Sequence, residues 1–195
     1  MKQIAIFASG AGSNAKKIIE GSLFPESGKK SELPYKVSLV VCNKPGAGVL
    51  KIAEENKIPT LLIDKEKFSQ GNAYVDELRS ANIDFIVLAG FLWKVPDILI
   101  KAFRGKMINI HPALLPKHGG KGMYGRFVHE AVIANKEKES GITVHYVDEV
   151  YDNGQIIMQA TCIVLENDTP ESLAKRVQML EHRHFPATVA FLASL

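Results

Sequence analysis

Cysteine is scarce in this chain, with Cys42 and Cys162 as the two occurrences in 195 residues. Both lie in apolar runs typical of strands, which favours buried structural thiols in a reducing compartment over a disulfide or a metal site. Long apolar runs are also lacking, because no stretch reaches the roughly 20 residues that a membrane-spanning helix needs. The first residues enter a strand without a basic region or a cleavage site, so we expect a cytoplasmic protein with no membrane partner.

Charge of one sign is equally limited. The formal net charge is +3, and no run of lysine or arginine could follow a phosphate backbone, so we expect no nucleic-acid partner. The chain is 46% apolar and 23% charged, as ordinary globular proteins are. Its length suits one domain with a real hydrophobic core.

Apolar, strand-like runs alternate with helix-like segments along most of the chain. Buried strands are predicted at 3–8, 35–42, 60–63, 84–89 and 107–110. Between them, helices are predicted up to Glu20, at 47–56, at 69–81 and from Pro96, with a surface loop at 21–34. This alternation predicts an α/β fold, a doubly wound, mostly parallel sheet with helices on both faces.

The pattern changes in the last part of the chain. Strands are predicted at 141–147 and 156–164, and the short acidic turn between them predicts an antiparallel edge pair near the C-terminal end. A helix is predicted at 127–135, and another from Pro170 onward, capped by Thr169 and broken near Pro186.

A glycine-containing turn, Ser9 to Ala15, joins the first strand to the first helix. Backbone N–H groups and the positive end of a helix make such a turn an anion site, and Ser13 and Asn14 add side-chain donors. The spacing of the glycines also fits a dinucleotide-binding fingerprint, which requires an acidic residue after the second strand. That strand ends in Asn43-Lys44-Pro45, so we favour a single phosphate and keep a non-catalytic nucleotide-binding module as an alternative.

The segment from Met107 to Pro116 carries the residues best suited to catalysis. Asn109 and His111 are two residues apart, so they point to the same side at the carboxyl end of a strand, where open α/β sheets bind ligands. An amide that stabilises an oxyanion, beside an imidazole that exchanges protons near neutral pH, suits attack on a carbonyl. The alternative is that Asn109 closes a turn and His111 is a surface histidine.

Other residues also have two interpretations. Asp152, just before Asn153-Gly154, could be a catalytic carboxylate or a turn former. His145 lies within a strand, and we expect it to be a packed core residue. Four glycines between Lys117 and Gly125 make a loop that could act as a lid. The apolar segment from Gly90 to Val95 could be a wall for a flat ring or a cover for the core.

Several groups of residues carry a family resemblance: Ser9-Gly10-Ala11-Gly12-Ser13-Asn14, Leu88-Ala89-Gly90-Phe91, Ile108-Asn109-Ile110-His111-Pro112-Ala113-Leu114-Leu115-Pro116, Val144-His145-Tyr146-Val147 with Asp152-Asn153-Gly154, and Glu181-His182 with Phe185-Pro186. Over essentially the whole chain, they resemble the glycinamide ribonucleotide formyltransferases, a family of folate-dependent enzymes of purine synthesis. The resemblance implies a single formyltransferase domain over 1–195, with a phosphate- or nucleotide-binding half of about 1–105 and a catalytic and folate-binding half of about 106–195.

The resemblance also implies roles for particular residues. The family's catalytic trio matches Asn109, His111 and Asp152. Its loop for the substrate phosphate matches Gly12, Ser13 and Asn14, and its contacts to the ribose end of the substrate fall at Gln178 and Glu181. Its folate-binding positions match Leu92, Trp93, Lys94, Val95, Asn109, Asp148, Glu149, Val150, Tyr151 and Asp152.

The implied reaction moves a formyl group from the co-substrate 10-formyltetrahydrofolate to the amine of glycinamide ribonucleotide. Asn109 and His111 would stabilise the oxyanion, a contribution of roughly 3 kcal/mol for one such donor. Asp152 would favour the imidazolium form of His111 and raise its pKa. We expect no metal, because the formyl donor is already activated, and we expect a monomer or a homodimer.

The alternative within folate chemistry is a formyltetrahydrofolate hydrolase, in which water replaces the amine. Such enzymes usually carry a further domain before the first strand, and this chain starts at the strand, so we expect the transferase.

Overall fold

The computed structural model describes residues 1–21 and 34–195. The surface loop expected at 21–34 therefore lies, apart from its two end residues, outside the described residues. The chain divides into two compact units, one made of Met1–Met107 with Pro186–Leu195 and the other of Ile108–Phe185. In the described parts of the chain, no helix is both long enough and apolar enough to cross a membrane.

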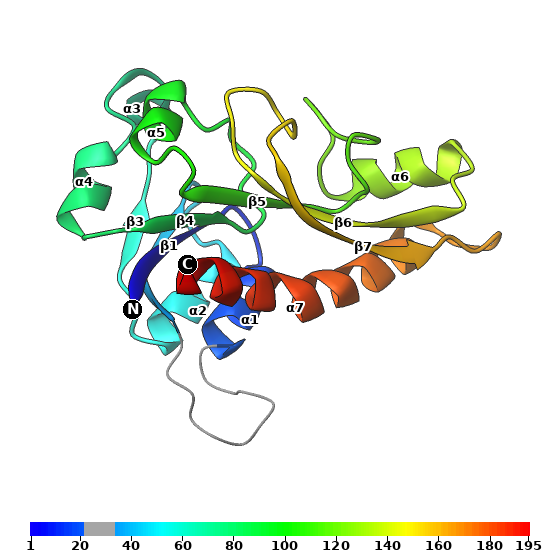
Figure 1. Ribbon diagram of the computed structural model, residues 1–195, viewed down its shortest axis with the longest axis horizontal. Helices are drawn as coiled ribbons and strands as arrows, with labels where there is room; N and C mark the ends of the chain where they lie inside the picture. The colour runs from blue at the N-terminus through cyan, green and yellow to red at the C-terminus, as the bar shows by residue number, and fades with distance from the viewer. Residues whose placement is uncertain (22–33) are drawn as a thin grey trace. The chain divides into compact units, whose positions relative to one another are not determined.

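The first unit is built from alternating strands and helices (Figure 1). Its strands are β1 (Lys2–Ala8), β2 (Tyr35–Cys42), β3 (Thr60–Leu62) and β4 (Phe85–Leu88), and its helices are α1 (Ser13–Gly21), α2 (Gly48–Glu55), α3 (Lys65–Gln70), α4 (Val75–Ser80) and α5 (Asp97–Ala102). β1 pairs in parallel with both β2 and β4, and β2 pairs in parallel with β3. Helices α1 and α2 lie on one face of these strands, and α3 and α5 lie on the other.

The central strands form because their residues are apolar on both faces. Ile4, Ile6, Ile86 and Val87 are completely buried. A parallel strand covered by helices on both sides needs such a continuous apolar run. Each of these strands delivers a loop at its carboxyl end, and two of those loops carry residues of the candidate site.

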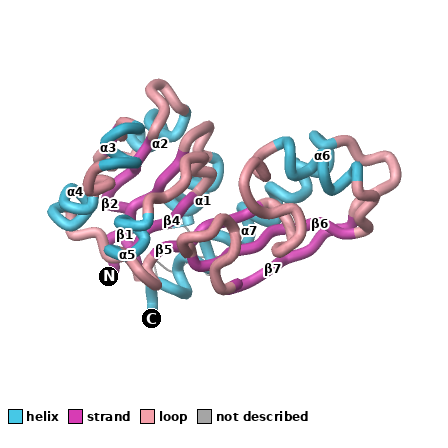
Figure 2. Tube along the Cα trace, turned by 90° about the horizontal axis from the view of Figure 1, so that it is seen from above, coloured by secondary structure: helices cyan, strands magenta, loops and turns pink. Residues whose placement is uncertain are grey.

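The second unit contains β5 (Met107–His111) from Ile108 onward, α6 (Arg126–Ala134), β6 (Glu139–Tyr146), β7 (Ile156–Ile163) and the first part of α7 (Pro170–Ser194). β6 pairs antiparallel with both β5 and β7, and β6 and β7 run side by side along most of their length (Figures 1 and 2). Helices α6 and α7 lie on opposite sides of this pair.

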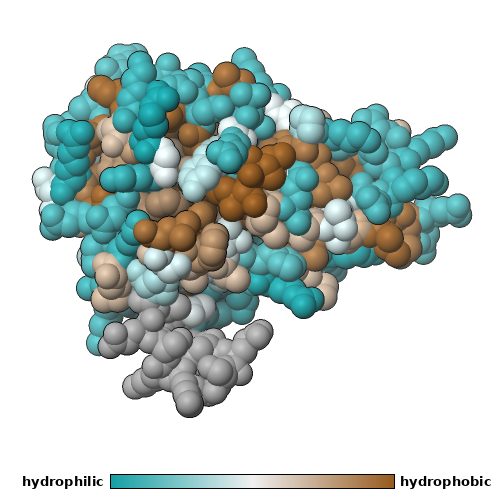
Figure 3. Space-filling view, in the orientation of Figure 1, coloured by the Kyte–Doolittle hydropathy of each residue, from teal (hydrophilic) through white to brown (hydrophobic). Residues whose placement is uncertain are grey.

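The hydrogen-bonded strand order is β3-β2-β1-β4-β5-β6-β7. This order confirms the predicted α/β class, a doubly wound sheet with parallel strands and an antiparallel pair at its C-terminal edge. Hydrophilic residues cover most of the face drawn in Figure 3, with apolar residues in patches between them.

Two helix predictions were wrong. The helix predicted at 69–81 is split into α3 and α4, because Ala73 and Tyr74 have φ values of 52° and 61° and break the helical path. The break predicted near Pro186 is absent, and α7 continues through this residue to Ser194. A proline inside a helix removes one backbone hydrogen bond, and here the rest of the long helix holds its conformation.

Candidate functional site

The turn after β1 is shaped by one glycine. Gly12 has a φ of +78°, and a Cβ atom there would lie 2.7 Å from the Cβ of Val49. The Val49 N–H donates to the Gly10 carbonyl at 3.2 Å, and the Lys16 N–H donates to the Gly12 carbonyl at 2.8 Å, where α1 begins. Ser13 and Asn14 are therefore the first residues of α1, the position at which helix N–H groups point outward and favour an anion.

A second loop of the same unit follows β4. Ser9 connects it to the first turn, because its N–H donates to the Gly90 carbonyl at 3.0 Å and its Oγ accepts from the Leu92 N–H at 2.9 Å. Gly90 has a φ of +77°, which an L side chain rarely adopts. The two loops at the carboxyl ends of β1 and β4 are thus fixed to each other.

The folate residues predicted in this second loop differ in exposure. Leu92 is 53% exposed, Lys94 is exposed and Val95 is buried. The Trp93 ring is half-buried and lies 5.9 Å, centroid to centroid, from the ring of Phe68. Val95 therefore covers the core, while Leu92 and Lys94 face outward, and a role of this loop as a wall for a flat ring stays a prediction.

In the second unit, β5 places Asn109 and His111 on the same side, as their spacing predicts. His111 is 3% exposed, and its Nδ1 lies 3.5 Å from Oδ2 of Asp152. Asp152 has a φ of +52°, in the left-handed region that costs energy for a residue with a side chain. Such local strain is often retained where it aims a functional group, and here it accompanies a carboxylate beside an imidazole.

His145 completes this cluster, which we call the Asp152 cluster: Asn109, His111, His145 and Asp152. His145 is the cross-strand partner of Asn109 in the pairing of β5 with β6. Its Nε2 lies 3.2 Å from Nδ2 of Asn109 and 3.6 Å from Oδ1 of Asp152. Its exposure of 2% confirms that it is a packed residue, and its contacts place it next to the predicted catalytic trio.

The glycine-containing loop at 117–125 contacts the Asp152 cluster through its backbone. Nε2 of His111 lies 2.8 Å from the His118 carbonyl, and the Gly120 N–H donates to Oδ2 of Asp152 at 2.9 Å. A Cβ atom on Gly119 would overlap Cδ2 of Leu115 and lie 3.2 Å from Cβ of Asp152. Glycine at this position therefore lets the loop pass close to the carboxylate.

Burial and charge act in opposite directions on the pKa values of this cluster. Burial lowers the pKa of His111 below its ordinary value of 6.5, although the Asp152 carboxylate and the His118 carbonyl both raise it. Burial raises the pKa of Asp152, but the rings of His145 and His111, which act on the carboxylate in their protonated form, and the Gly120 N–H together bring the net pKa below 3.8. The expected effect of Asp152, which raises the pKa of His111, is therefore confirmed in direction, but desolvation outweighs it and the net pKa is lowered.

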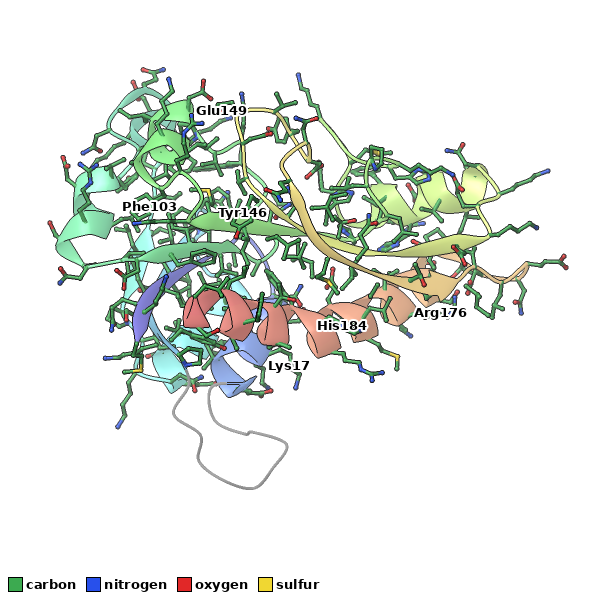
Figure 4. All side chains as sticks on the ribbon, viewed as in Figure 1. Lys17, Phe103, Tyr146, Glu149, Arg176 and His184 are labelled. Carbon is green, nitrogen blue, oxygen red and sulfur yellow. The ribbon has the colours of Figure 1, made fainter. Side chains whose placement is uncertain are left out.

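The segment before Asp152 is an exposed turn. The carboxylate of Asp148 accepts from the Val150 N–H at 2.9 Å and from Nδ2 of Asn153 at 3.2 Å. Val150 is 61% exposed and Tyr151 is 42% exposed. Glu149, labelled in Figure 4, lies in the same turn. Asp148 thus folds the turn on itself, and Val150 and Tyr151 present their side chains to solvent.

The predicted ribose contacts lie on α7. Gln178 is exposed and Glu181 is half-buried, and both belong to the part of α7 in the second unit. Gly12, Ser13 and Asn14 belong to the first unit. Within residues 1–21 and 34–195, no group of three or more His, Cys, Asp or Glu side chains could hold a metal ion.

Sequence reasoning missed three contributors to the site: His145, the His118 carbonyl and the Gly120 N–H. The signal for His145 was its place opposite Asn109, which becomes visible only when the register of the two strands is known. The signal for the loop at 117–125 was its high glycine content, next to the strand that ends at His111. This content indicated that the loop backbone passes close to the site, but not which atoms it contacts.

Comparisons with known proteins agree on one family. Residues 2–189 match the family model described as "Formyl transferase". A "Phosphoribosylglycinamide formyltransferase" of Bacillus subtilis is 36% identical over 199 residues, covering 100% of this chain and 96% of the relative. The crystal structure of phosphoribosylglycinamide formyltransferase from Bacillus halodurans superposes with a TM-score of 0.87 at 39% identity, over 99% of this chain and 96% of that one.

The plant relatives are longer than this chain. A chloroplastic phosphoribosylglycinamide formyltransferase of Arabidopsis thaliana is 42% identical over 193 residues, which cover 96% of this chain. The match takes in 64% of the Arabidopsis protein, and the match to the corresponding protein of Vigna unguiculata takes in 61% of it. The chain therefore spans less than two thirds of the length of these plant proteins.

Proposed function

The chain belongs to the formyl transferase family, and from this premise we propose that it transfers a formyl group from 10-formyltetrahydrofolate to the amine of glycinamide ribonucleotide. The products are formylglycinamide ribonucleotide and tetrahydrofolate, a step of purine synthesis. The observation that carries the proposal is the Asp152 cluster, where an amide, two imidazoles and a carboxylate meet at the carboxyl end of β5. An amide donor, a proton acceptor and a fixed carboxylate are what amine attack on a formyl carbon requires.

In the proposed reaction, the amine nitrogen attacks the formyl carbon, and the carbonyl oxygen becomes negatively charged. Asn109 donates an N–H to this oxygen. Nε2 of His111 is a second donor, and it must exchange the His118 carbonyl, 2.8 Å away, for the substrate oxygen. Removal of one oxyanion donor of this kind typically costs a factor of about 10²–10³ in kcat.

The attacking nitrogen becomes positively charged and must lose a proton before the folate nitrogen leaves. The low pKa of Asp152 keeps its carboxylate ionised, and the low pKa of His111 keeps the ring neutral at pH 7. Asp152 can therefore receive the proton, directly or through a water, and share it with Nδ1 of His111 at 3.5 Å. The proton then passes to N10 of the folate as the C–N bond breaks.

We assign substrate contacts from the same family match. Gly12, Ser13 and Asn14 would bind the phosphate of glycinamide ribonucleotide, and Gln178 and Glu181 would contact its ribose end. The folate positions remain those predicted from the sequence, namely Leu92 to Val95, Asn109, and Asp148 to Asp152. The monomeric or homodimeric state and the cytoplasmic location remain predictions, which gel filtration and cell fractionation can check.

The test is a formyl-transfer assay on the purified full chain. We expect release of tetrahydrofolate only when glycinamide ribonucleotide is present, whereas formyl loss without it would indicate the hydrolase. We expect His111→Ala and Asp152→Asn to remove most of the turnover while the far-UV circular dichroism spectrum is retained. Tight binding of NAD with no binding of folate would overturn the proposal in favour of a nucleotide-binding module.

Glu55→Ala is the matched control for these variants. Glu55 is a carboxylate on the first unit that is 61% exposed and 4.0 Å from Lys51. Its removal should leave turnover unchanged. If either cluster variant retains a rate near that of the wild type, the role given to that residue is wrong.

A further inference from the structure

His145 makes contacts that the proposed chemistry has not yet used. Its Nδ1 lies 2.8 Å from the backbone carbonyl of Tyr146. Its Nε2 faces Nδ2 of Asn109 at 3.2 Å. The ring is buried, so these bonds are not replaced by solvent.

The chemistry of these partners fixes where the protons lie. A carbonyl oxygen only accepts, so Nδ1 of His145 must carry the hydrogen that it donates to Tyr146. In the neutral ring, Nε2 is then a bare acceptor. An acceptor at this place holds the NH₂ side of the Asn109 amide, so the amide cannot turn its oxygen toward His145.

The same reasoning gives His111 the opposite tautomer. Its Nε2 faces the His118 carbonyl at 2.8 Å and must carry the hydrogen. The two histidines that flank Asp152 therefore differ, with His145 protonated on Nδ1 and His111 protonated on Nε2. The bare nitrogens of both rings therefore face Asp152, with Nε2 of His145 3.6 Å from Oδ1 and Nδ1 of His111 3.5 Å from Oδ2.

We propose that His145 is a positioning residue for Asn109, holding one N–H of the amide so that the other N–H points at the formyl oxygen. This proposal rests on the proposed function for the identity of that oxygen. His145 itself does not touch the substrate. A free Asn109 amide could rotate and present its oxygen, which would repel the developing negative charge.

The arrangement depends on His145 being neutral. A second hydrogen on Nε2 would face the NH₂ group of Asn109 and would turn instead to Oδ1 of Asp152 at 3.6 Å. The groups that face this ring are the Asn109 amide, the Asp152 carboxylate and the His111 ring. His145 can therefore accept a hydrogen bond from Asn109 only while its Nε2 carries no hydrogen.

The first test is spectroscopic and needs no activity. The ring nitrogens of ¹⁵N-histidine-labelled protein are assigned at pH 8 by comparison with His145→Gln and His111→Ala. We expect a protonated Nδ1 and a bare Nε2 for His145, and the reverse for His111. A protonated Nε2 on His145 would overturn the proposal, even if the enzyme transfers formyl groups as proposed.

The second test is a double-mutant cycle between His145 and Asn109. His145→Phe keeps the ring shape without the acceptor, and we expect kcat to fall by about tenfold with little change in KM. His145→Gln places an amide oxygen at a similar reach, so it should recover most of the loss. In an Asn109→Ala background, His145→Phe should lower kcat by less than about twofold, because residues that act as a unit are not additive.

Val144→Ala is the structural control for this cycle. Val144 is adjacent in β6, is completely buried and pairs with Ile110, away from the Asn109 amide. It should lower the melting temperature without a comparable fall in kcat. Equal losses for His145→Phe in the wild-type and Asn109→Ala backgrounds would show that His145 acts independently of Asn109, which would contradict the proposal. A wild-type chain with no transfer activity would overturn the proposed function instead, and the nitrogen spectra would still decide the tautomer.

Discussion

At the scale of single residues, His111 shows how burial and charge compete. Its ring is 3% exposed, and desolvation disfavours the charged imidazolium. The carboxylate of Asp152 at 3.5 Å favours it, and the net result is a pKa below 6.5. The carboxylate therefore limits a fall in the pKa that burial alone would make larger.

We expect Asp152→Asn to lower the pKa of His111 further, because it removes the negative charge and leaves the burial. The measurement is an NMR titration of the His111 ring protons in the wild type and the variant. Asp148→Asn is the control, since that carboxylate bonds to Val150 and Asn153 instead of His111. An unchanged or higher pKa in Asp152→Asn would mean that the two groups do not interact as the geometry indicates.

The same cluster shows what sequence can reveal about a site. Asn109 and His111 could be predicted because two residues in one strand share a side. Asp152 lies far along the chain, so it was assigned through the family resemblance and not from its own surroundings. The role of His145 could not be predicted, because it depends on the register of β5 against β6, which is set by long-range pairing.

At the scale of elements, the junction of β7 and α7 is held by one buried carboxylate. Asp168 is 3% exposed at its side chain and accepts from Nη1 and Nη2 of Arg176 at 2.6 and 3.0 Å. Nη1 of Arg176, labelled in Figure 4, also donates to the Ile163 carbonyl at 3.0 Å. The Ser172 N–H donates to Oγ1 of Thr169 at 3.2 Å, which confirms the threonine cap predicted for this helix. Strand end and helix start are thus fixed by shared polar contacts.

We expect Asp168→Ala to lower the free energy of unfolding by about 2–3 kcal/mol, because it leaves the arginine fork without its partner. The bonds from Arg176 hold the pKa of Asp168 well below its ordinary value of 3.8. A depressed pKa stabilises the folded state above the ordinary value and loses this contribution as the pH falls. Urea unfolding should therefore show the full difference between wild type and variant at pH 7 and a smaller one below about pH 4. A difference that does not change with pH would contradict the assignment.

The contact between α1 and β2 depends on a buried phenol. The hydroxyl of Tyr35 donates to the Ile18 carbonyl at 2.8 Å, and burial raises its pKa to about 12. A raised pKa contributes stability that is complete below the ordinary value of 10 and is lost as the pH rises toward 12. This link between helix and strand should therefore weaken in alkaline solution.

We expect Tyr35→Phe to cost about 1 kcal/mol at pH 7, through the lost hydrogen bond. Between pH 10 and 12, the stability of the wild type should fall more steeply than that of the variant, so that the difference between them closes. Urea unfolding at pH 7, 10 and 11 measures both effects. Parallel pH profiles for the two proteins would show that Tyr35 does not titrate as a buried group.

The elements themselves were easier to predict than their interruptions. β2 was predicted at 35–42 and found at Tyr35–Cys42, because a mostly apolar run of this length is typical of a buried strand in a parallel sheet. The split between α3 and α4 was missed, since positive φ values at Ala73 and Tyr74 follow from packing and not from residue type. At Pro186 the error was the reverse, because a break was predicted where the helix continues. A proline can be accommodated within a helix as long as α7.

At the scale of the whole molecule, ligand binding should raise the free energy of unfolding and the melting temperature. A ligand that binds only the folded state stabilises it by about 2.7 kcal/mol at 100 times its dissociation constant. For a chain of this size, that corresponds to a rise in melting temperature of roughly 5–10 °C. Glycinamide ribonucleotide and tetrahydrofolate should each produce such a rise if the proposed function is right.

Gly12→Ala should separate the two ligands. The new Cβ would lie 2.7 Å from Cβ of Val49, on a backbone with a φ of +78°, so the turn must distort. We expect the variant to lose most of the shift caused by glycinamide ribonucleotide, whose phosphate we assign to this turn, and to keep the shift caused by tetrahydrofolate. Differential scanning fluorimetry with each ligand measures both.

Gly105→Ala is the matched control, because Gly105 has a similar φ of +69° but open space around its missing side chain. It introduces the same kind of backbone strain without touching the turn after β1. It should lower the melting temperature of the free protein and keep both ligand shifts. If Gly12→Ala keeps the full shift with glycinamide ribonucleotide, the phosphate binds elsewhere. If Gly12→Ala and Gly105→Ala both lose the shift with glycinamide ribonucleotide, backbone strain alone explains the loss. That result would contradict the assignment of the phosphate to the turn after β1.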